Sequence, residues 1–334
     1  MSNIAVLGAG TWGIALAVML AENHHVTVWS ALEHELDELG KNRHHPNLPE
    51  ASVIPDEIAF EKDIKSALQD KDIVLFAVPS PFVRSTARLA APFITEKQIL
   101  VDVAKGIESD TLFTMSQVIE SELNNDKIKV IALSGPTHAE EVALGLPTAI
   151  VAAGKEDSVV QEVCKTFSTD YMRVYANDDI LGVELCGAIK NVIALAAGIS
   201  AGLGYGDNAK AALITRGATE MARLGLAMGC KVQTFAGLAG VGDLIVTATS
   251  VHSRNNRCGM LIGQGKKTDE AVRQVGMVVE GINALEAVMK LAGHYQVDMP
   301  IVQAVNAVIN QGLDPRKAVQ NLMNRETKAN EFDS

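Results

Sequence analysis

A glycine-rich turn near the start of the chain constrains the fold more than any other feature. Residues 8–13 read GAGTWG, with the spacing G-x-G-x-x-G, and they lie between an apolar run at residues 4–7 and a helical run at 14–20. In such a turn the first glycine makes the bend, the second lets the backbone approach a pyrophosphate, and the third allows close helix packing. The helix N-terminus then offers free N–H groups to the phosphates. The stretch predicts a dinucleotide-binding unit.

The same stretch is the segment we considered as a membrane span. Residues 4–21 carry no charge and are just long enough to cross a bilayer. Glycines at positions 8, 10 and 13 interrupt it, no Lys or Arg precedes it, and no small-residue cleavage site follows it. We therefore expect a strand, a turn and a helix, with neither export nor membrane insertion.

Alternating patterns along the first half predict an α/β fold. Helical segments at residues 11–22, 63–69 and 111–124 separate short apolar runs, which implies a mostly parallel sheet covered on both faces, as in a Rossmann-type domain. The runs lie at residues 4–7, 26–29, 73–78, 99–103, 130–133, 149–153 and 172–175. Beyond about residue 180 helical patterning dominates, as at 209–226, 281–292 and 301–310. We predict a dinucleotide-binding domain at 1–180 and an all-α substrate-binding domain at 181–334.

Charge and cysteine content exclude several classes of partner. A formal charge of −11 and an aromatic content of 4% argue against nucleic acid and against an anionic membrane surface. An anionic ligand must therefore be held by a local basic cluster. The four cysteines lack the CxxC spacing of metal sites, so we expect no metal, and reduced thiols in a cytoplasmic protein.

The end of the second strand leaves the choice between NAD and NADP open. A fold that binds NAD normally places an acid there, on the ribose hydroxyls. Here Ser30 and Ala31 follow the run at residues 26–29, and neither is charged. Ser30 could reach a ribose or a 2′-phosphate, and Glu33 lies nearby but already inside the next helix.

Two segments that follow strands in the first half are candidates for ligand binding. Lys105 comes just after the run at residues 99–103, and open α/β sheets bind ligands at the carboxyl ends of their strands. A solvated loop lysine is the competing interpretation. Residues 134–137, SGPT, end another strand and precede a helical segment at 138–144, so backbone N–H groups there could bind an anionic or polar substrate. His138 is either a general base or a helix-capping imidazole.

The second half contains an isolated lysine and a donor-rich segment. Lys190 lies in the middle of VELCGAIKNVIALAAG, where no acid stands three or four residues away, so its partner must come from elsewhere in the chain. Asp243 follows three closely spaced glycines, which allow a tight backbone approach. Residues 253–257, SRNNR, form the densest set of phosphate-compatible donors, and Arg254 can bind a phosphate through two N–H groups. A basic surface turn is the competing interpretation, above all for Arg257.

Together these motifs resemble the NAD(P)-dependent glycerol-3-phosphate dehydrogenase family of bacterial type, over nearly the whole chain. The segments are GAGTWGIALA, AKGIE, SGPTHAEEVALGLPTA, ELCGAIKNVIALAAGISAGLGYGDNAKAALITRG, GLAGVGDLIVTATS, SRNNRCG and VVEGINA. The resemblance implies interconversion of dihydroxyacetone phosphate and sn-glycerol 3-phosphate with NAD(P)H, for glycerophospholipid synthesis. Bacterial relatives often carry a histidine or arginine where this chain has Ala31.

The resemblance also implies a role for individual residues. Lys190 would transfer the proton, with Asp243 beside it to keep the ammonium form accessible, and Lys105 would add electrostatic stabilisation. The implied cofactor-binding residues are Gly8, Gly10, Thr11, Trp12, Gly13, Lys105, Ala139, Arg254, Val278 and Glu280. The implied substrate-binding residues are Lys105, Gly135, Thr137, Lys190, Asn191, Asp243, Ser253, Arg254 and Asn255.

Two alternatives remain at this stage. The chain could be a related Rossmann oxidoreductase acting on a 3-hydroxyacid, 6-phosphogluconate or ketopantoate, since those enzymes also pair a glycine turn with a lysine on a long helix. It could also be a nucleotide-sensing protein without chemistry. The SGPT and SRNN segments favour the glycerol phosphate enzyme over the first. The joint presence of Lys190, Lys105 and Asp243 argues against the second. A homodimer is possible, since apolar stripes on the helical half could be either core or interface.

Overall fold

The computed structural model describes residues 1–326, and these residues divide into two compact units. The first unit comprises Met1–Lys105 and Phe113–Ile180, and the second comprises Gly106–Leu112 and the chain from Leu181 onward. The short segment Gly106–Leu112 thus groups with the second unit, although it lies within the stretch that the sequence assigned to the first. Lys290 Nζ donates to Ser109 O over 3.0 Å and joins this segment to the second unit.

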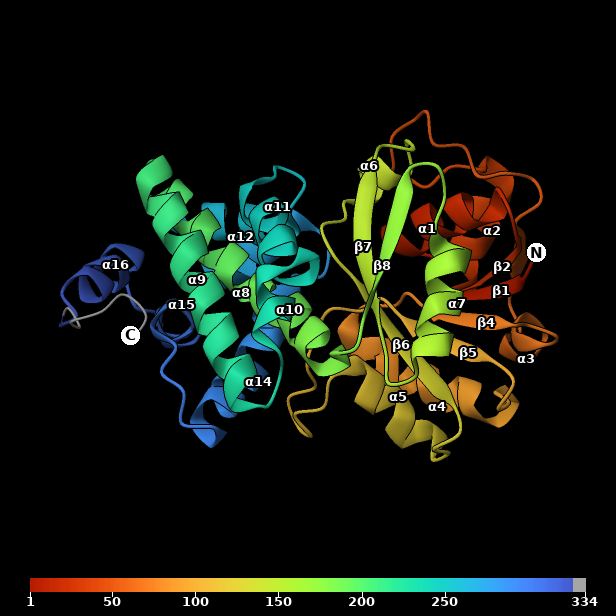
Figure 1. The fold of residues 1–334 in the computed structure, drawn as a ribbon. Helices are drawn as coiled ribbons and strands as arrows, with labels where there is room; N and C mark the ends of the chain where they lie inside the picture. The colour runs from red at the N-terminus through yellow and green to blue at the C-terminus, as the bar shows by residue number, and fades with distance from the viewer. Residues whose placement is uncertain (327–334) are drawn as a thin grey trace. The chain divides into compact units, whose positions relative to one another are not determined.

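An eight-stranded sheet forms the centre of the first unit (Figure 1). Its spatial order is β3-β2-β1-β4-β5-β6-β7-β8, with β7 antiparallel to β6 and all other neighbours parallel. The strands are β1 (Asn3–Leu7), β2 (His25–Trp29), β3 (Ala59–Glu61), β4 (Ile73–Phe76), β5 (Ile99–Asp102), β6 (Lys129–Ser134), β7 (Thr148–Ala153) and β8 (Met172–Asn177). This mostly parallel sheet confirms the predicted α/β class.

Helices cover both faces of this sheet, because successive strand residues point to opposite sides. Ile4 and Val6 of β1 belong to one apolar cluster, whereas Ala5 and Leu7 belong to another. The first cluster packs against α1 (Thr11–Ala21), α2 (Glu33–Asn42) and α7 (Asp157–Phe167). The second packs against α3 (Ile64–Leu68), α4 (Val83–Ala90) and α5 (Met115–Leu123) (Figure 1). The remaining helical turns are α6 (Ala139–Val142), η1 (Ser80–Phe82) and η2 (Ala91–Phe93).

From Ile180 to Met323 the regular elements of the second unit are all helical, as predicted. Its longest helix, α8 (Ile180–Gly202), is followed by α9 (Asp207–Ala227). The remaining elements are α10 (Val232–Ala236), the π-helical turn η3 (Leu238–Gly242), α11 (Asp243–Thr249), α12 (Arg254–Gly263), α13 (Thr268–Val275), α14 (Glu280–His294), α15 (Pro300–Gln311) and α16 (Pro315–Met323). Residues 327–334 of the predicted second domain lie outside the described part.

Close backbone contact fixes α8 against α12. A Cβ atom added at Gly198 of α8 would lie 2.1 Å from Asn256 O, and one added at Gly259 of α12 would lie 2.1 Å from Leu195 O. Real Cβ atoms do not approach an oxygen so closely, so glycine is required on both helices. The two helices therefore pack with main chain against main chain, which fixes Lys190 of α8 relative to the first turn of α12.

A buried carboxylate joins two further helices of this unit. Glu220 of α9 is 3% exposed, and its oxygens accept hydrogen bonds from Ile301 N at 2.8 Å and Val302 N at 3.3 Å. These N–H groups belong to the first turn of α15, where no intrahelical acceptor exists. Burial raises the pKa of Glu220 to about 7, despite the two backbone hydrogen bonds and the nearby Arg223, which lower it.

The segment that could span a membrane by length and composition is not the one considered from the sequence. Residues 4–21 form β1, the glycine turn and α1, as expected. Within residues 1–326, the helix that is long and apolar enough to span a bilayer is instead α8, which was not predicted as a candidate from the sequence. Of its most apolar window, 89% is buried within the protein, as in the core helix of a globular domain.

Candidate active site

The glycine turn leaves room for a phosphate beside the backbone. Gly8 has φ +126°, and a Cβ there would lie 2.6 Å from Ala77 O; a Cβ at Gly13 would lie 2.2 Å from Gly8 O. A Cβ at Gly10 would instead project into open space. Gly10 precedes α1 and provides no side-chain cap, so the first N–H groups of that helix remain available to an anion. The turn therefore fits a dinucleotide pyrophosphate.

The carboxyl ends of β1 and β2 are held together at this turn. Gly8 N donates to Trp29 O over 2.8 Å, so Ser30, the next residue, lies beside the glycine turn. Ser30 is buried, and its hydroxyl donates to Glu35 Oε2 at 3.1 Å and accepts from Leu32 N at 3.1 Å. Glu35 was not predicted from the sequence as a site residue. The available indication was that Glu35 lies five residues after Ser30, on the first turn of α2.

A second group of predicted residues meets at the end of β6. Lys105 Nζ donates to Gly135 O over 3.1 Å, and Thr137 Oγ1 donates to the same oxygen over 3.1 Å. Gly135 has φ +152°, and a Cβ there would lie 2.9 Å from Ile150 Cα. The sharp turn after β6 thus brings Lys105, thirty residues before Gly135 in the chain, to the same carbonyl oxygen as Thr137. His138 precedes α6 at its N-cap position, where its side chain makes no capping hydrogen bond.

In the second unit, Lys190 forms a buried ion pair with Asp243. Its Nζ donates to Asp243 Oδ1 and to Thr247 Oγ1, each at 2.6 Å, and the lysine and aspartate side chains are 6% and 0% exposed. Thr247 Oγ1 lies 2.7 Å from Asp243 O and donates to it. The partner that Lys190 lacks along its own helix therefore comes from α11. An unpaired ammonium is costly to bury, and these two acceptors offset that cost for Lys190.

The sequence analysis missed Thr247, although a signal was available. Asp243 and Thr247 are four residues apart on one helix, so their side chains lie on the same face. A π-helical turn, η3, immediately precedes Asp243, and Gly240 within it lies against the backbone of Phe235, where a Cβ would be 2.0 Å from the carbonyl oxygen. Such turns interrupt regular helix geometry and are frequent at functional sites.

An amide chain links three helices next to this ion pair. Asn191, adjacent to Lys190, donates to Gly187 O at 3.1 Å and accepts from Asn255 Nδ2 at 3.0 Å. Asn255 Oδ1 in turn accepts from Gly281 N at 2.8 Å, in the first turn of α14. The side chains of Asn191 and Asn255 therefore bind protein atoms, and their predicted contact with substrate stays a prediction.

The remaining predicted residues lie at helix starts. Ser253 is the N-cap of α12 and accepts from Asn256 N at 3.2 Å, while Arg254 is the first residue of that helix and is exposed. Glu280 begins α14, with the half-buried Val278 just before it. Thr11 and Trp12 begin α1, and Ala139 begins α6.

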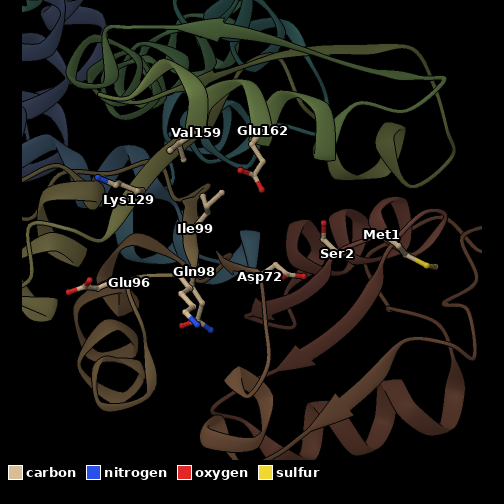
Figure 2. A pocket seen from close by; sticks show the side chains of 10 residues that line it. Met1, Ser2, Asp72, Glu96, Gln98, Ile99, Lys129, Val159 and Glu162 are labelled. Atoms are coloured by element: carbon tan, nitrogen blue, oxygen red, sulfur yellow. The ribbon is translucent and has the colours of Figure 1, made fainter.

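A polar pocket of about 500 Å³ lies at the amino ends of the strands, whereas the glycine turn lies at their carboxyl ends (Figure 2). Asp72 and Ile99 lie at the amino ends of β4 and β5, and Lys129 begins β6. The pocket also includes Glu96 and Glu162, and no predicted site residue lines it. Because ligands of such sheets bind at the carboxyl ends of the strands, this pocket is separate from the glycine turn.

Comparison with known proteins identifies the family. Residues 3–160 match the family described as the NAD-dependent glycerol-3-phosphate dehydrogenase N-terminus, and residues 179–320 match the corresponding C-terminus. The chain belongs to this dehydrogenase family. The dehydrogenase accordingly takes NAD(P)H as its cofactor, in agreement with the fit of the glycine turn.

Similar proteins cover the dehydrogenase from end to end. Glycerol-3-phosphate dehydrogenase [NAD(P)+] 2 of Lactobacillus delbrueckii subsp. bulgaricus is 61% identical over 98% of this chain and 99% of its own length. Glycerol-3-phosphate dehydrogenase [NAD(P)+] of Agathobacter rectalis is 49% identical over 98% of this chain and 97% of its own length. The crystal structure of glycerol-3-phosphate dehydrogenase from Coxiella burnetii is 38% identical and superposes with a TM-score of 0.91 over 97% of this chain and 99% of that one.

The related oxidoreductases considered as alternatives are not favoured. A ketopantoate reductase from Ralstonia eutropha superposes with a TM-score of 0.63 at 16% identity over 96% of this chain and all of that one, a likeness that shows the shared fold alone.

Among residues 1–326, no cluster of three or more His, Cys, Asp or Glu side chains is placed to hold a metal ion.

Proposed function

We propose that this dehydrogenase interconverts dihydroxyacetone phosphate and sn-glycerol 3-phosphate. The observation that carries the proposal is the buried Lys190, whose ammonium group is held by Asp243 and Thr247. The glycine turn, whose open side at Gly10 fits a pyrophosphate, supports the cofactor half of the reaction. The relatives named glycerol-3-phosphate dehydrogenase support the choice of substrate.

NAD(P)H, held through its pyrophosphate by the glycine turn, would supply the hydride chemistry for C2 of the substrate. In the reductive direction the oxygen on C2 gains negative charge, and Lys190 donates a proton to it. In the oxidative direction Lys190 receives the proton from the hydroxyl group. Asp243 keeps the charged form of the lysine stable in a buried position, and Thr247 fixes the direction of its N–H groups. General acid–base help of this kind is typically worth about 10²–10⁴-fold in rate.

Phosphate recognition is assigned to the first turn of α12. The N–H groups at a helix start and the partial positive charge there favour an anion. Arg254, exposed at this position, can add two parallel N–H contacts to a phosphate. Lys105, held at Gly135 O, is a further cation that we assign to the substrate through the resemblance to the family.

We also propose a setting for the reaction. The product would enter glycerophospholipid synthesis, and the protein would act in the cytoplasm, with small molecules rather than nucleic acid or a membrane as partners. A homodimer stays a prediction. Sedimentation analysis of the purified chain would test it.

The decisive experiment compares Lys190→Ala with Lys127→Ala. We expect the first variant to lose nearly all turnover of dihydroxyacetone phosphate, followed by the absorbance of the reduced nicotinamide, while its affinity for the nucleotide stays close to normal. The second removes a lysine whose side chain is 75% exposed and should leave turnover unchanged. Near-normal kcat in Lys190→Ala would refute the assignment of the proton-transfer residue. Absence of turnover in the unsubstituted protein would refute the substrate.

A further inference from the structure

We propose that Ser30 and Glu35 make this dehydrogenase select NADH over NADPH. The inference rests on the proposed function, since it concerns the cofactor of that same reaction. The two cofactors differ only by a phosphate on the 2′-oxygen of the adenosine ribose. In this class of fold that oxygen is read by residues just after the second strand.

The hydrogen bonds of Ser30 define what its hydroxyl can recognise. A serine hydroxyl has one proton to donate and two lone pairs that accept. The proton of Ser30 is donated to Glu35 Oε2, and one lone pair accepts from Leu32 N. What remains is a single acceptor position. A ribose hydroxyl can donate to it, whereas a fully ionised 2′-phosphate has no proton to donate.

The charges around Ser30 also oppose a 2′-phosphate. The first turn of α2 carries the carboxylates of Glu33 and Glu35 and no Lys or Arg, so acids already compensate the positive end of this helix. The half-buried Glu35 is the carboxylate in direct contact with Ser30. A doubly charged phosphate brought to this position would meet like charge in a partly desolvated place.

Lys62 does not reverse this balance. Lys62 follows β3, and its Nζ lies 2.8 Å and 2.9 Å from the two carboxylate oxygens of Asp37, and 3.8 Å from Glu33. Together, the side chains of Glu33, Glu35, Asp37 and Lys62 carry a net charge of −2. The exposed His34 lies on the same turn, so all measurements share one buffer and one pH.

The test measures binding to the full chain by isothermal titration calorimetry, without substrate. We expect NADH to bind at least about tenfold more tightly than NADPH, and 5′-AMP to bind more tightly than adenosine 2′,5′-bisphosphate. Added salt should reduce both ratios, because it screens the repulsion. Equal or tighter binding of NADPH would overturn the inference and leave the proposed function intact. Binding of neither nucleotide would overturn both.

Three variants then assign the effect to residues. Glu35→Gln keeps a hydrogen-bond partner for Ser30 but removes the charge, and Ala31→Arg adds a cation at an exposed position. Each should lower the NADH-to-NADPH affinity ratio severalfold or more, chiefly by tightening NADPH. Glu38→Gln removes an exposed charge further along α2 and should leave the ratio unchanged. A ratio in Glu35→Gln equal to that of the unsubstituted protein would refute the role of Glu35.

Discussion

The buried carboxylate of Glu220 makes the stability of the second unit depend on pH. Burial raises its folded-state pKa from 4.5 to about 7, while the unfolded chain keeps the ordinary value. Between these pH values the folded state binds the proton that the unfolded state has lost. The stabilisation is therefore complete below about pH 4.5 and is lost as the pH rises through about 7. With one pKa unit worth about 1.4 kcal/mol, the total loss is about 3 kcal/mol.

Glu220→Gln removes this titration and keeps one oxygen to accept from Ile301 N. We expect the free energy of unfolding of the unsubstituted protein to fall by about 2–3 kcal/mol more than that of the variant between about pH 5 and about pH 8. A constant cost from the weakened contact with Val302 N does not affect this comparison.

Urea unfolding followed by far-ultraviolet circular dichroism records the helices of both units, and the two longest, α8 and α9, belong to the second. Both tryptophans, Trp12 and Trp29, lie in the first unit, so their fluorescence reports separately on that unit. Glu286→Gln, which removes a carboxylate whose side chain is 64% exposed, is the matched control and should show the pH dependence of the unsubstituted protein. Identical pH dependence in Glu220→Gln and the unsubstituted protein would refute the reasoning.

Three further predictions, two of them with a matched control variant, test the site and its support. Thr247→Val should lower kcat about 10–100-fold without changing nucleotide affinity, because a hydrogen bond to the Lys190 ammonium is lost. Thr247→Ser keeps the hydroxyl and should recover most of the lost kcat. A normal kcat in the valine variant would contradict the role of this hydrogen bond. Gly198→Ala should cost about 1–3 kcal/mol of unfolding free energy. Gly293→Ala, in an open helical position, should stabilise by up to about 1 kcal/mol, and equal effects of the two alanines would refute the close-contact argument. Arg254→Ala should raise KM for dihydroxyacetone phosphate far more than for dihydroxyacetone, and equal losses would remove Arg254 from phosphate recognition.

The sequence predicted those parts of the fold in which local pattern and tertiary structure agree. Seven of the eight strands follow apolar or strand-like runs, and those buried on both faces, such as β4 and β5, have no polar side to show. The strand that was missed, β3, has three residues, Ala59–Glu61, that are exposed or half-buried at the edge of the sheet. The antiparallel direction of β7 was also not predicted, since an apolar run reads the same in both directions.

In the site, the sequence located residues whose surroundings are unusual along the chain. Lys190 drew attention because its own helix has no partner for it, and the structure places Asp243 against it. Thr247 and Glu35 were missed because a threonine inside a helix and a glutamate on a helix start are common in any protein. Their importance comes from contacts that only the folded chain makes.

The glycine contacts between α8 and α12 also determine how structures of this protein are best compared. Helices that touch through their main chains have no side chains between them to repack, so they can be displaced only as a pair. These two helices therefore form a natural reference frame for superposition. This frame is the most reliable one against which to measure ligand-induced movements. Such movements could involve the side chain of Arg254, the first turn of α14, or α15.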